Sequence, residues 1–221
     1  MCGRFTLKTP LNQLLLRFQL PPLEWDYTPR YNIAPTQKIL TVVSTKGKPK
    51  AVPMRWGLIP YWAKESRIGA KMINARQETL TEKVSFRNLV DRKRCLILAD
   101  GFYEWTTKNS AKIPMYITLR EGSPFAMAGL WDTWKQPHDE PIYSCTIITT
   151  NANELLSPIH HRMPVILRPD HEEMWLSSAP FSELINLLEP YPSDLMHFYQ
   201  VSTLVNSPKN DIPECIAQTT H

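Results

Sequence analysis

Glycine and cysteine are scarce in this chain, and long apolar runs are missing from it. The 221 residues include seven glycines against twenty prolines, with no Gly/Ser run and no internal period, so we expect neither flexible linkers nor a repeat architecture. The four cysteines, at positions 2, 95, 145 and 215, are widely separated and form no C-x-x-C pair. This spacing indicates neither a zinc site nor a disulfide framework, and we expect a reduced, intracellular protein.

No apolar stretch is long enough to span a membrane, and the start of the chain lacks the apolar segment of a signal peptide. Because residue 2 is not glycine, N-myristoylation is also excluded. We therefore expect no membrane association.

The charge and the aromatic residues permit a nucleic-acid partner. A net charge of +4 and a pI near 8.8 are mildly basic and give weak support for such a partner by themselves. Tyr61, Trp62 and Trp105 could stack on unpaired bases. Packing in the core is the commoner role of such residues.

The pattern of apolar residues predicts an α+β protein. Apolar positions after Thr9 and Pro10 predict a short helix that Thr9 caps and that ends near Pro21. A capping-box pattern predicts a helix over 79–92. Two later helices are predicted, one after residue 169 with Asp170 as a possible cap and one over 182–188. Ranges rich in β-branched and aromatic residues predict strands at 39–44, 51–56, 95–99, 102–106, 115–119, 125–130 and 143–150.

The first two of these strands flank a turn at 46–49 and predict a hairpin. Since the strands dominate and most of them precede the later helices, we expect a mostly antiparallel β-sheet or barrel core with a few flanking helices. With 43% hydrophobic residues, the chain can bury a core of its own, and we expect one compact domain over 1–221.

Cys2 is the first candidate reactive residue. Methionine aminopeptidase accepts small second residues, so we expect Met1 to be removed. An N-terminal cysteine carries an amine and a thiol on adjacent carbons, and this 1,2-aminothiol condenses with an aldehyde to an imine and then to a thiazolidine. Reference pKa values of about 8 for the amine and about 8.5 for the thiol leave some of each nucleophile at neutral pH. A nearby arginine would enlarge the thiolate fraction. From the residues alone, an ordinary terminal cysteine is the simpler interpretation.

Three further segments hold candidate residues. Asn74 can orient a substrate and Arg76 can bind a phosphate, although a turn former and a solvated charge are common in loops. Glu104 stands in an aromatic run, where a partly dry environment would raise its pKa and let it exchange protons near neutrality; a glutamate on an exposed strand face is the alternative. His160 is a candidate proton carrier, and Arg162 suits a phosphate.

The histidines do not indicate a metal site. Adjacent residues such as His160 and His161 point to opposite faces of a strand, and no Cys, Asp or Glu set accompanies them. The segment from His171 begins like H-E-x-x-H but has Trp175 where the second histidine must stand, which excludes that zinc motif. We expect no metal and no cofactor.

Seven blocks in the chain closely resemble those of the SOS-response-associated peptidase (SRAP) family, in the same order and over nearly the whole length. They are MCGRF at 1–5, RYNIAP at 30–35, RWGLIP at 55–60, NARQET at 74–79, DGFYEW at 100–105, H-x-RMP at 160–164 and VNSPKN at 205–210. The resemblance implies a β core, a basic groove for single-stranded DNA and an active site of Cys2, Asn74, Glu104 and His160. It also implies DNA contacts by Arg4, Trp62, Arg76, Trp105, Thr149 and Arg162. Some family members have a double tryptophan at the Trp62 position, and this chain has Tyr61 in place of the first.

The function that the resemblance implies is the sensing and shielding of abasic sites in single-stranded DNA. The mature Cys2 would form a covalent thiazolidine crosslink, with no cofactor. Self-removal of Met1 and a lyase activity are further implied possibilities. We expect a monomer, in the cytoplasm with the nucleoid or in the nucleus of a eukaryote. Two alternatives remain open: an N-terminal-nucleophile cysteine hydrolase or peptidase, and a non-catalytic module that binds single-stranded DNA.

Overall fold

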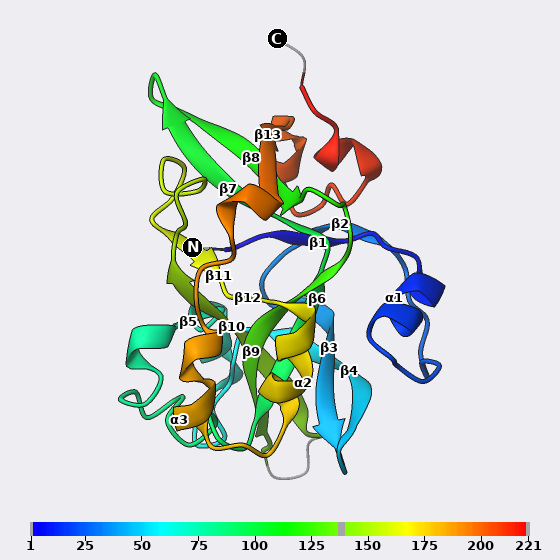
Figure 1. The fold of residues 1–221 in the computed structure, drawn as a ribbon, viewed down its shortest axis with the longest axis vertical. Coiled ribbons are helices and arrows are strands. Elements are labelled where there is room, and N and C mark those ends of the chain that lie inside the picture. The colour runs from blue at the N-terminus through cyan, green and yellow to red at the C-terminus, as the bar shows by residue number, and fades with distance from the viewer. Residues whose placement is uncertain (1, 137–139, 220–221) are drawn as a thin grey trace.

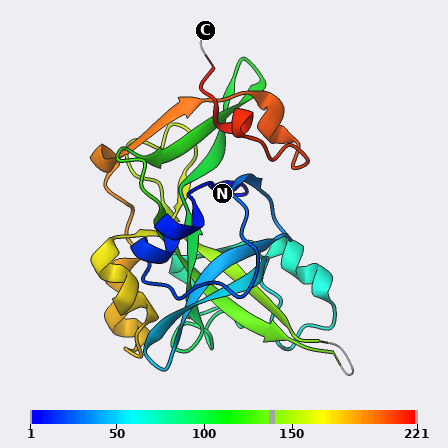
Figure 2. The same ribbon diagram turned by 90° about the vertical axis from the view of Figure 1, so that its right-hand side faces the viewer.

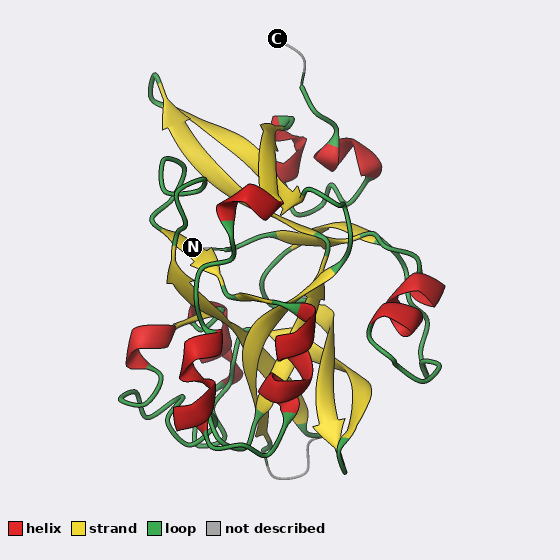
Figure 3. Ribbon diagram, viewed as in Figure 1, coloured by secondary structure: helices red, strands yellow, loops and turns green. Residues whose placement is uncertain are grey.

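Strands make up most of the regular structure, and the short helices lie around them (Figure 3). The computed structural model describes residues 2–136 and 140–219. The strands are β1 (Phe5–Leu7), β2 (Arg30–Ile33), β3 (Lys38–Thr45), β4 (Lys48–Trp56), β5 (Asn74–Arg76), β6 (Arg94–Ala99), β7 (Gly101–Lys108), β8 (Ala111–Leu119), β9 (Phe125–Trp134), β10 (Ile142–Asn151), β11 (Arg162–Pro164), β12 (Ile166–Leu167) and β13 (Met196–Gln200).

The helices are all short. The α-helices are α1 (Leu11–Arg17), α2 (Pro169–Leu176) and α3 (Phe181–Leu184), and the 3-10 helices are η1 (Ser66–Lys71), η2 (Gln77–Thr79), η3 (Ile185–Leu187), η4 (Ser193–Leu195), η5 (Thr203–Asn206) and η6 (Pro213–Ile216). Among the described residues, none of these helices combines the length and apolar character needed to cross a membrane.

Five strands close into a ring in the order β10-β4-β3-β6-β9, because β9 pairs again with β10. The expected α+β class with a β-barrel core is therefore confirmed. Two parallel pairings, of β10 with β4 and with β5, interrupt the otherwise antiparallel pattern. The predicted hairpin is β3–β4, and positive φ angles at Lys46 (52°) and Gly47 (75°) form its tight turn, as the right-handed twist of the two strands favours.

A second sheet has the order β13-β8-β7-β1-β2. Its strand β1 lies between the β7–β8 hairpin and the ring in two perpendicular views (Figures 1 and 2). Buried Asp100 fastens β1 to the turn between β6 and β7, because its carboxylate accepts bonds from Thr6 Oγ1 (2.5 Å) and from the backbone N–H of Lys8 (2.6 Å) and Thr9 (2.8 Å). The start of the chain is thus held in the interior between the two sheets.

Strand β7 alternates as its aromatic sequence predicts. Phe102 packs in the main core, whereas Tyr103 packs with Tyr116 and Val205 in a smaller cluster that Trp105 covers. Glu104 therefore projects from the same face as Phe102.

Three predictions about helices were wrong in detail. The N-cap position of the first helix is Pro10 and not Thr9. The Thr9 hydroxyl donates to Asp100 Oδ2 (3.0 Å) and makes no capping bond to the helix. The later helix starts after Arg168, and Asp170 lies in its first turn.

The third error is the helix predicted over 79–92. The chain there forms successive turns in which i→i+3 and i→i+4 bonds alternate, and the Thr79 hydroxyl lies 3.4 Å from the carbonyl of Arg76. Leu80, Phe86 and Val90 are nevertheless buried, so the segment packs its apolar residues without a regular helix.

Candidate active site

Cys2 lies just before β1 and is fully buried. Strand β1 pairs with β7 in the register Phe5↔Phe102, and the Tyr103 N–H donates to the Arg4 carbonyl at 2.9 Å. This ladder carries Cys2 toward the part of β7 that holds Glu104.

Asn74 contacts Cys2 from strand β5. It is the first residue of β5, which pairs in parallel with β10 opposite Ile147. Its Nδ2 donates to the carbonyl of Cys2 at 2.9 Å. Its Oδ1 is buried and accepts no hydrogen bond from the described residues. The amide therefore holds the Cys2 backbone and keeps one acceptor for a further donor.

Glu104 is electrostatically coupled to Cys2. The side chain is buried, and burial raises the pKa of its carboxyl, against the opposing positive charges of the N-terminal amine and His161. Burial is also the largest cause that raises the pKa of the Cys2 thiol, and the negative charge of Glu104 raises it further. A carboxylate of raised pKa beside a thiol is suited to accept the proton of that thiol.

The thiol is therefore not activated as the sequence suggested. We expected an arginine to enlarge the thiolate fraction, but Arg4 Nη1 donates instead to Asn32 Oδ1 (2.8 Å) and to the Val205 carbonyl (2.8 Å). Because the pKa of the thiol is raised, a reaction of this thiol would need a base.

His160 faces the site from the loop before β11. Its Nδ1 lies 3.0 Å from the backbone nitrogen of Arg162 and 3.1 Å from the carbonyl oxygen of that residue. In the tautomer that accepts the Arg162 N–H, the ring carries its proton on Nε2, where it can donate. Burial is the main cause that lowers the pKa of this imidazole, and the hydrogen bond to the Arg162 backbone opposes it by a smaller amount.

Arg162 is buried in a network of its own. Its guanidinium makes a two-bond pair with Glu78 (2.5 and 3.0 Å) and donates to Asn151 Oδ1 (2.8 Å) and to the Thr149 carbonyl (2.6 Å). These bonds fix the end of β10 against β11 and η2. Arg162 thus shapes the His160 loop, and it offers little free donor capacity to a phosphate in this state.

The other expected DNA contacts lie in different environments. Arg76 is exposed at the end of β5, opposite Thr149 of β10 in the register of the two strands. Thr149 itself is buried. Trp105 is partly buried, and its indole Nε1 donates to Asn206 Oδ1 at 2.8 Å. Of these three side chains, Arg76 is therefore the one most open to a phosphate.

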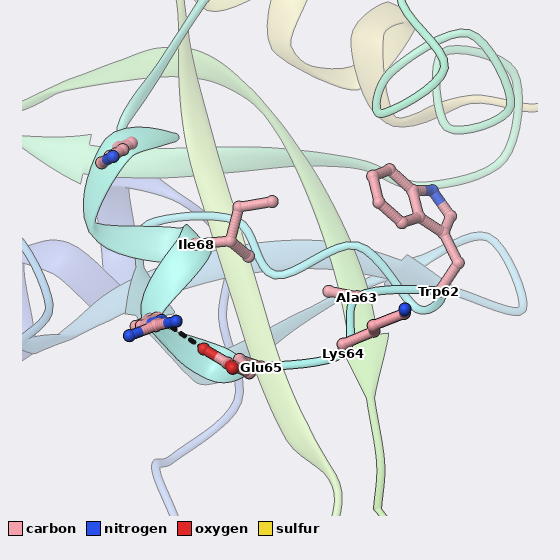
Figure 4. A pocket seen from close by; sticks show the side chains of 7 residues that line it. Trp62, Ala63, Lys64, Glu65 and Ile68 are labelled. Atoms are coloured by element: carbon pink, nitrogen blue, oxygen red, sulfur yellow. Dashed lines mark ion pairs between the residues drawn. The ribbon is translucent and has the colours of Figure 1, made fainter.

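Trp62 lies in a separate surface hollow of about 620 Å³. In Figure 4 its ring and Ile68 face each other across this space, and Lys64 and the ion pair of Arg67 with Glu65 border it. The hollow is formed by the segment that leads through η1 into β5. The hollow is apolar at the Trp62 indole and basic at its rim.

Sequence reasoning missed two residues of the site. Glu78 pairs with Arg162, and His161 stacks on His160 with ring centroids 4.4 Å apart. Glu78 stands within the NARQET block, and His161 was considered only as a metal ligand. In the described residues no group of three or more His, Cys, Asp or Glu could hold a metal ion.

A cysteine near the start of the chain, with its carbonyl bound by Asn74 and its thiol coupled to buried Glu104, lies beside a closed β ring and defines a β-rich protein with a candidate cysteine site. The family model described as "SOS response associated peptidase (SRAP)" matches residues 1–208, and the chain belongs to this family.

Related proteins agree with this assignment. The chain is 50% identical over 221 residues to the abasic site processing protein YoqW of Bacillus subtilis (strain 168), with 98% of this chain and 99% of that protein covered. It is 37% identical to the abasic site processing protein HMCES of Gallus gallus, with 87% of this chain and 67% of that protein covered. A crystal structure of a Bacteroides thetaiotaomicron protein matches with a TM-score of 0.88 at 27% identity, covering 99% of this chain and 100% of that one.

Proposed function

We propose that this protein processes abasic sites in single-stranded DNA, by forming a covalent thiazolidine crosslink through Cys2 after removal of Met1. The observation that carries the proposal is the convergence on Cys2: Asn74 holds its carbonyl, and Glu104 is coupled to its thiol. Relatives up to 50% identical over nearly the whole chain are named abasic site processing proteins. The protein would act as one domain and without a cofactor.

The chemistry starts from the amine, because the buried thiol holds its proton firmly. His160 donates a proton to the ring oxygen as the abasic sugar opens to its aldehyde. The α-amine of Cys2 adds to the aldehyde carbon, and loss of one water gives an imine. The thiol then adds to the imine carbon, its proton passes through Glu104 to the imine nitrogen, and the five-membered ring closes. The net products are the thiazolidine and one water.

Asn74 would keep the reacting groups in register. Its Nδ2 already holds the Cys2 carbonyl, and its buried Oδ1 has room for a donor from the amine or the sugar. Arg4 and Arg76 would lie along the phosphates, with Thr149 and Arg162 supporting the same surface. Trp62 and Trp105 would contact bases.

The test is intact-mass and denaturing-gel analysis of the protein mixed with single-stranded DNA that holds one abasic site. We expect loss of Met1 and a heat-stable adduct whose mass is the sum of the two components minus one water. Cys2→Ala should abolish the stable adduct, and Cys2→Ser should leave only an imine that borohydride traps.

Three other results would overturn the proposal. The absence of an adduct with the processed protein would refute the covalent step. Binding that does not depend on Cys2 would favour a non-catalytic single-strand module. Cleavage of peptide substrates by the same thiol, without an adduct, would favour a cysteine hydrolase. The same samples report whether a catalytically dead variant retains Met1, as self-removal requires, and whether the strand is cut, as a lyase activity requires.

A further inference from the structure

His160 and His161 form a stacked pair beside the active site. Their ring centroids are 4.4 Å apart and the ring planes are inclined by 24°. His160 is partly buried and His161 is exposed. The backbone fixes both, because the His160 N–H donates to the Leu156 carbonyl (2.9 Å) and the Ala152 N–H donates to the His161 carbonyl (3.0 Å).

The charges around His161 come from several elements. Arg162 of β11 and Arg76 of β5 disfavour a proton on it, and the charge of His160 is the largest of these effects. Glu104 of β7 is the opposing group, because the positive charge of His161 lowers the pKa of that carboxyl. His161 is therefore in electrostatic contact with both catalytic side chains, Glu104 and His160.

The stack bears on how the His160 ring lies. The charge of His160 lowers the pKa of His161, whereas burial is the main cause that lowers the pKa of His160. Two flat rings in stacked contact restrict each other's rotation. This restriction acts on His160, the group that must present Nε2 to the sugar oxygen.

We propose that His161 is a positioning residue for His160, and that it holds the His160 imidazole by stacking so that Nε2 can face the sugar oxygen. The role rests on the proposed function of the site and extends it to a residue outside the four that carry the chemistry. His161 touches neither the sugar nor Cys2 in this scheme, and it acts through His160.

Two variants separate the stacked ring from the histidine itself. His161→Phe keeps a flat ring, so the crosslinking rate at pH 7 should stay within about threefold of the wild-type rate. His161→Ala removes the stack, and the rate should fall about three- to tenfold, since ring pairs contribute about 0.5–1.5 kcal/mol. His171→Phe, a change to a histidine on α2, is the matched control and should leave the rate unchanged.

The measurements are the single-turnover rate of crosslinking with abasic DNA and, without DNA, the NMR signals of the His160 ring in labelled protein. A loss of rate in His161→Ala that is absent in His161→Phe supports the role, because the flat ring alone then restores the position of His160. A wild-type rate in His161→Ala, or an equal loss in both variants, overturns it. If the wild-type protein forms no crosslink at any pH, the proposed function fails instead, and the NMR signals of His160 in the two variants still report whether the stack holds its ring.

Discussion

Glu104 combines a cost in stability with a proposed role in the reaction. Burial raises the pKa of its carboxyl, so the folded state favours the protonated form. At a pH above the ordinary carboxyl value, the buried charge therefore lowers the free energy of unfolding, and this penalty disappears as the pH falls through the raised pKa.

We expect Glu104→Gln to slow crosslinking by about 10²–10⁴-fold, the range that a general base contributes. The same variant should melt at a higher temperature than the wild type at pH 8, and the difference should shrink as the pH is lowered. Melting curves between pH 4 and 8 and single-turnover crosslinking check both parts. Glu121→Gln, on an exposed turn, is the control. A variant with full activity, or one that melts lower at pH 8, would contradict the assignment.

Glu78 shows the opposite linkage. The hydrogen bonds from Arg162 are the main cause that lowers the pKa of this carboxyl. A lowered pKa contributes stability at a pH above the ordinary carboxyl value of about 4.3, and this contribution is lost as the pH falls through the lowered value.

Glu78→Gln should cost about 1 kcal/mol at pH 7, because its side chain is 44% exposed and solvent screens the pair. That loss corresponds to a melting temperature about 2–4 °C lower. The deficit should vanish as the pH falls below the lowered pKa of Glu78, whereas the exposed Glu82→Gln should show none at any pH. A deficit that persists unchanged at low pH would show that the ion pair is not its source.

Single residues differ in how far the sequence predicts their surroundings. The aromatic alternation of β7 placed Glu104 correctly on the face of Phe102, since a strand fixes the direction of each side chain. The partner of Arg162 could not be predicted, because Glu78 and Arg162 meet only after β5 and β11 pair with opposite edges of β10.

At the scale of elements, the long buried strands were predicted better than the short ones. β10 is rich in β-branched residues and buried over most of its length, and β6 is buried throughout, so local composition and the final environment agree. In the segment 79–92, burial of Leu80 and Phe86 decides the conformation, and the capping pattern that predicted a helix is overridden by tertiary packing.

The crossing of the strand end at Gly57 with η1 is an element contact that is sensitive to substitution. Gly57 has φ +126°, and a Cβ there would lie 2.5 Å from the carbonyl oxygen of Gly69. The Leu58 N–H donates to the Met72 carbonyl at 3.0 Å just beyond this crossing. The contact therefore sets the path of the segment that leads into Asn74.

Gly57→Ala should lower the free energy of unfolding by about 3 kcal/mol or more, through backbone strain and the clash with Gly69. Hydrogen exchange should become faster in residues 66–74. Gly47→Ala is the matched control, because its φ is +75° and no atom lies within 4 Å of the added Cβ, so it should cost only about 1–2 kcal/mol. Equal losses in the two variants would show that the crossing is not under steric constraint.

At the scale of the whole molecule, a net charge of +4 is too small to bind DNA by general attraction alone, so a few placed cations must carry the phosphate contacts. Arg162 is paired with Glu78 and Arg4 with Asn32, whereas Arg76 is exposed beside the site.

For single strands, the logarithm of affinity falls with the logarithm of salt by about 0.7 per phosphate contact. Arg76→Gln should therefore reduce the slope by about 0.7 for DNA without a lesion, when measured by fluorescence anisotropy between 50 and 300 mM salt. Lys48→Gln, at the exposed tip of the β3–β4 hairpin, removes the same charge elsewhere and should leave the slope unchanged. If both variants reduce the slope equally, the net charge and not the position of Arg76 governs binding.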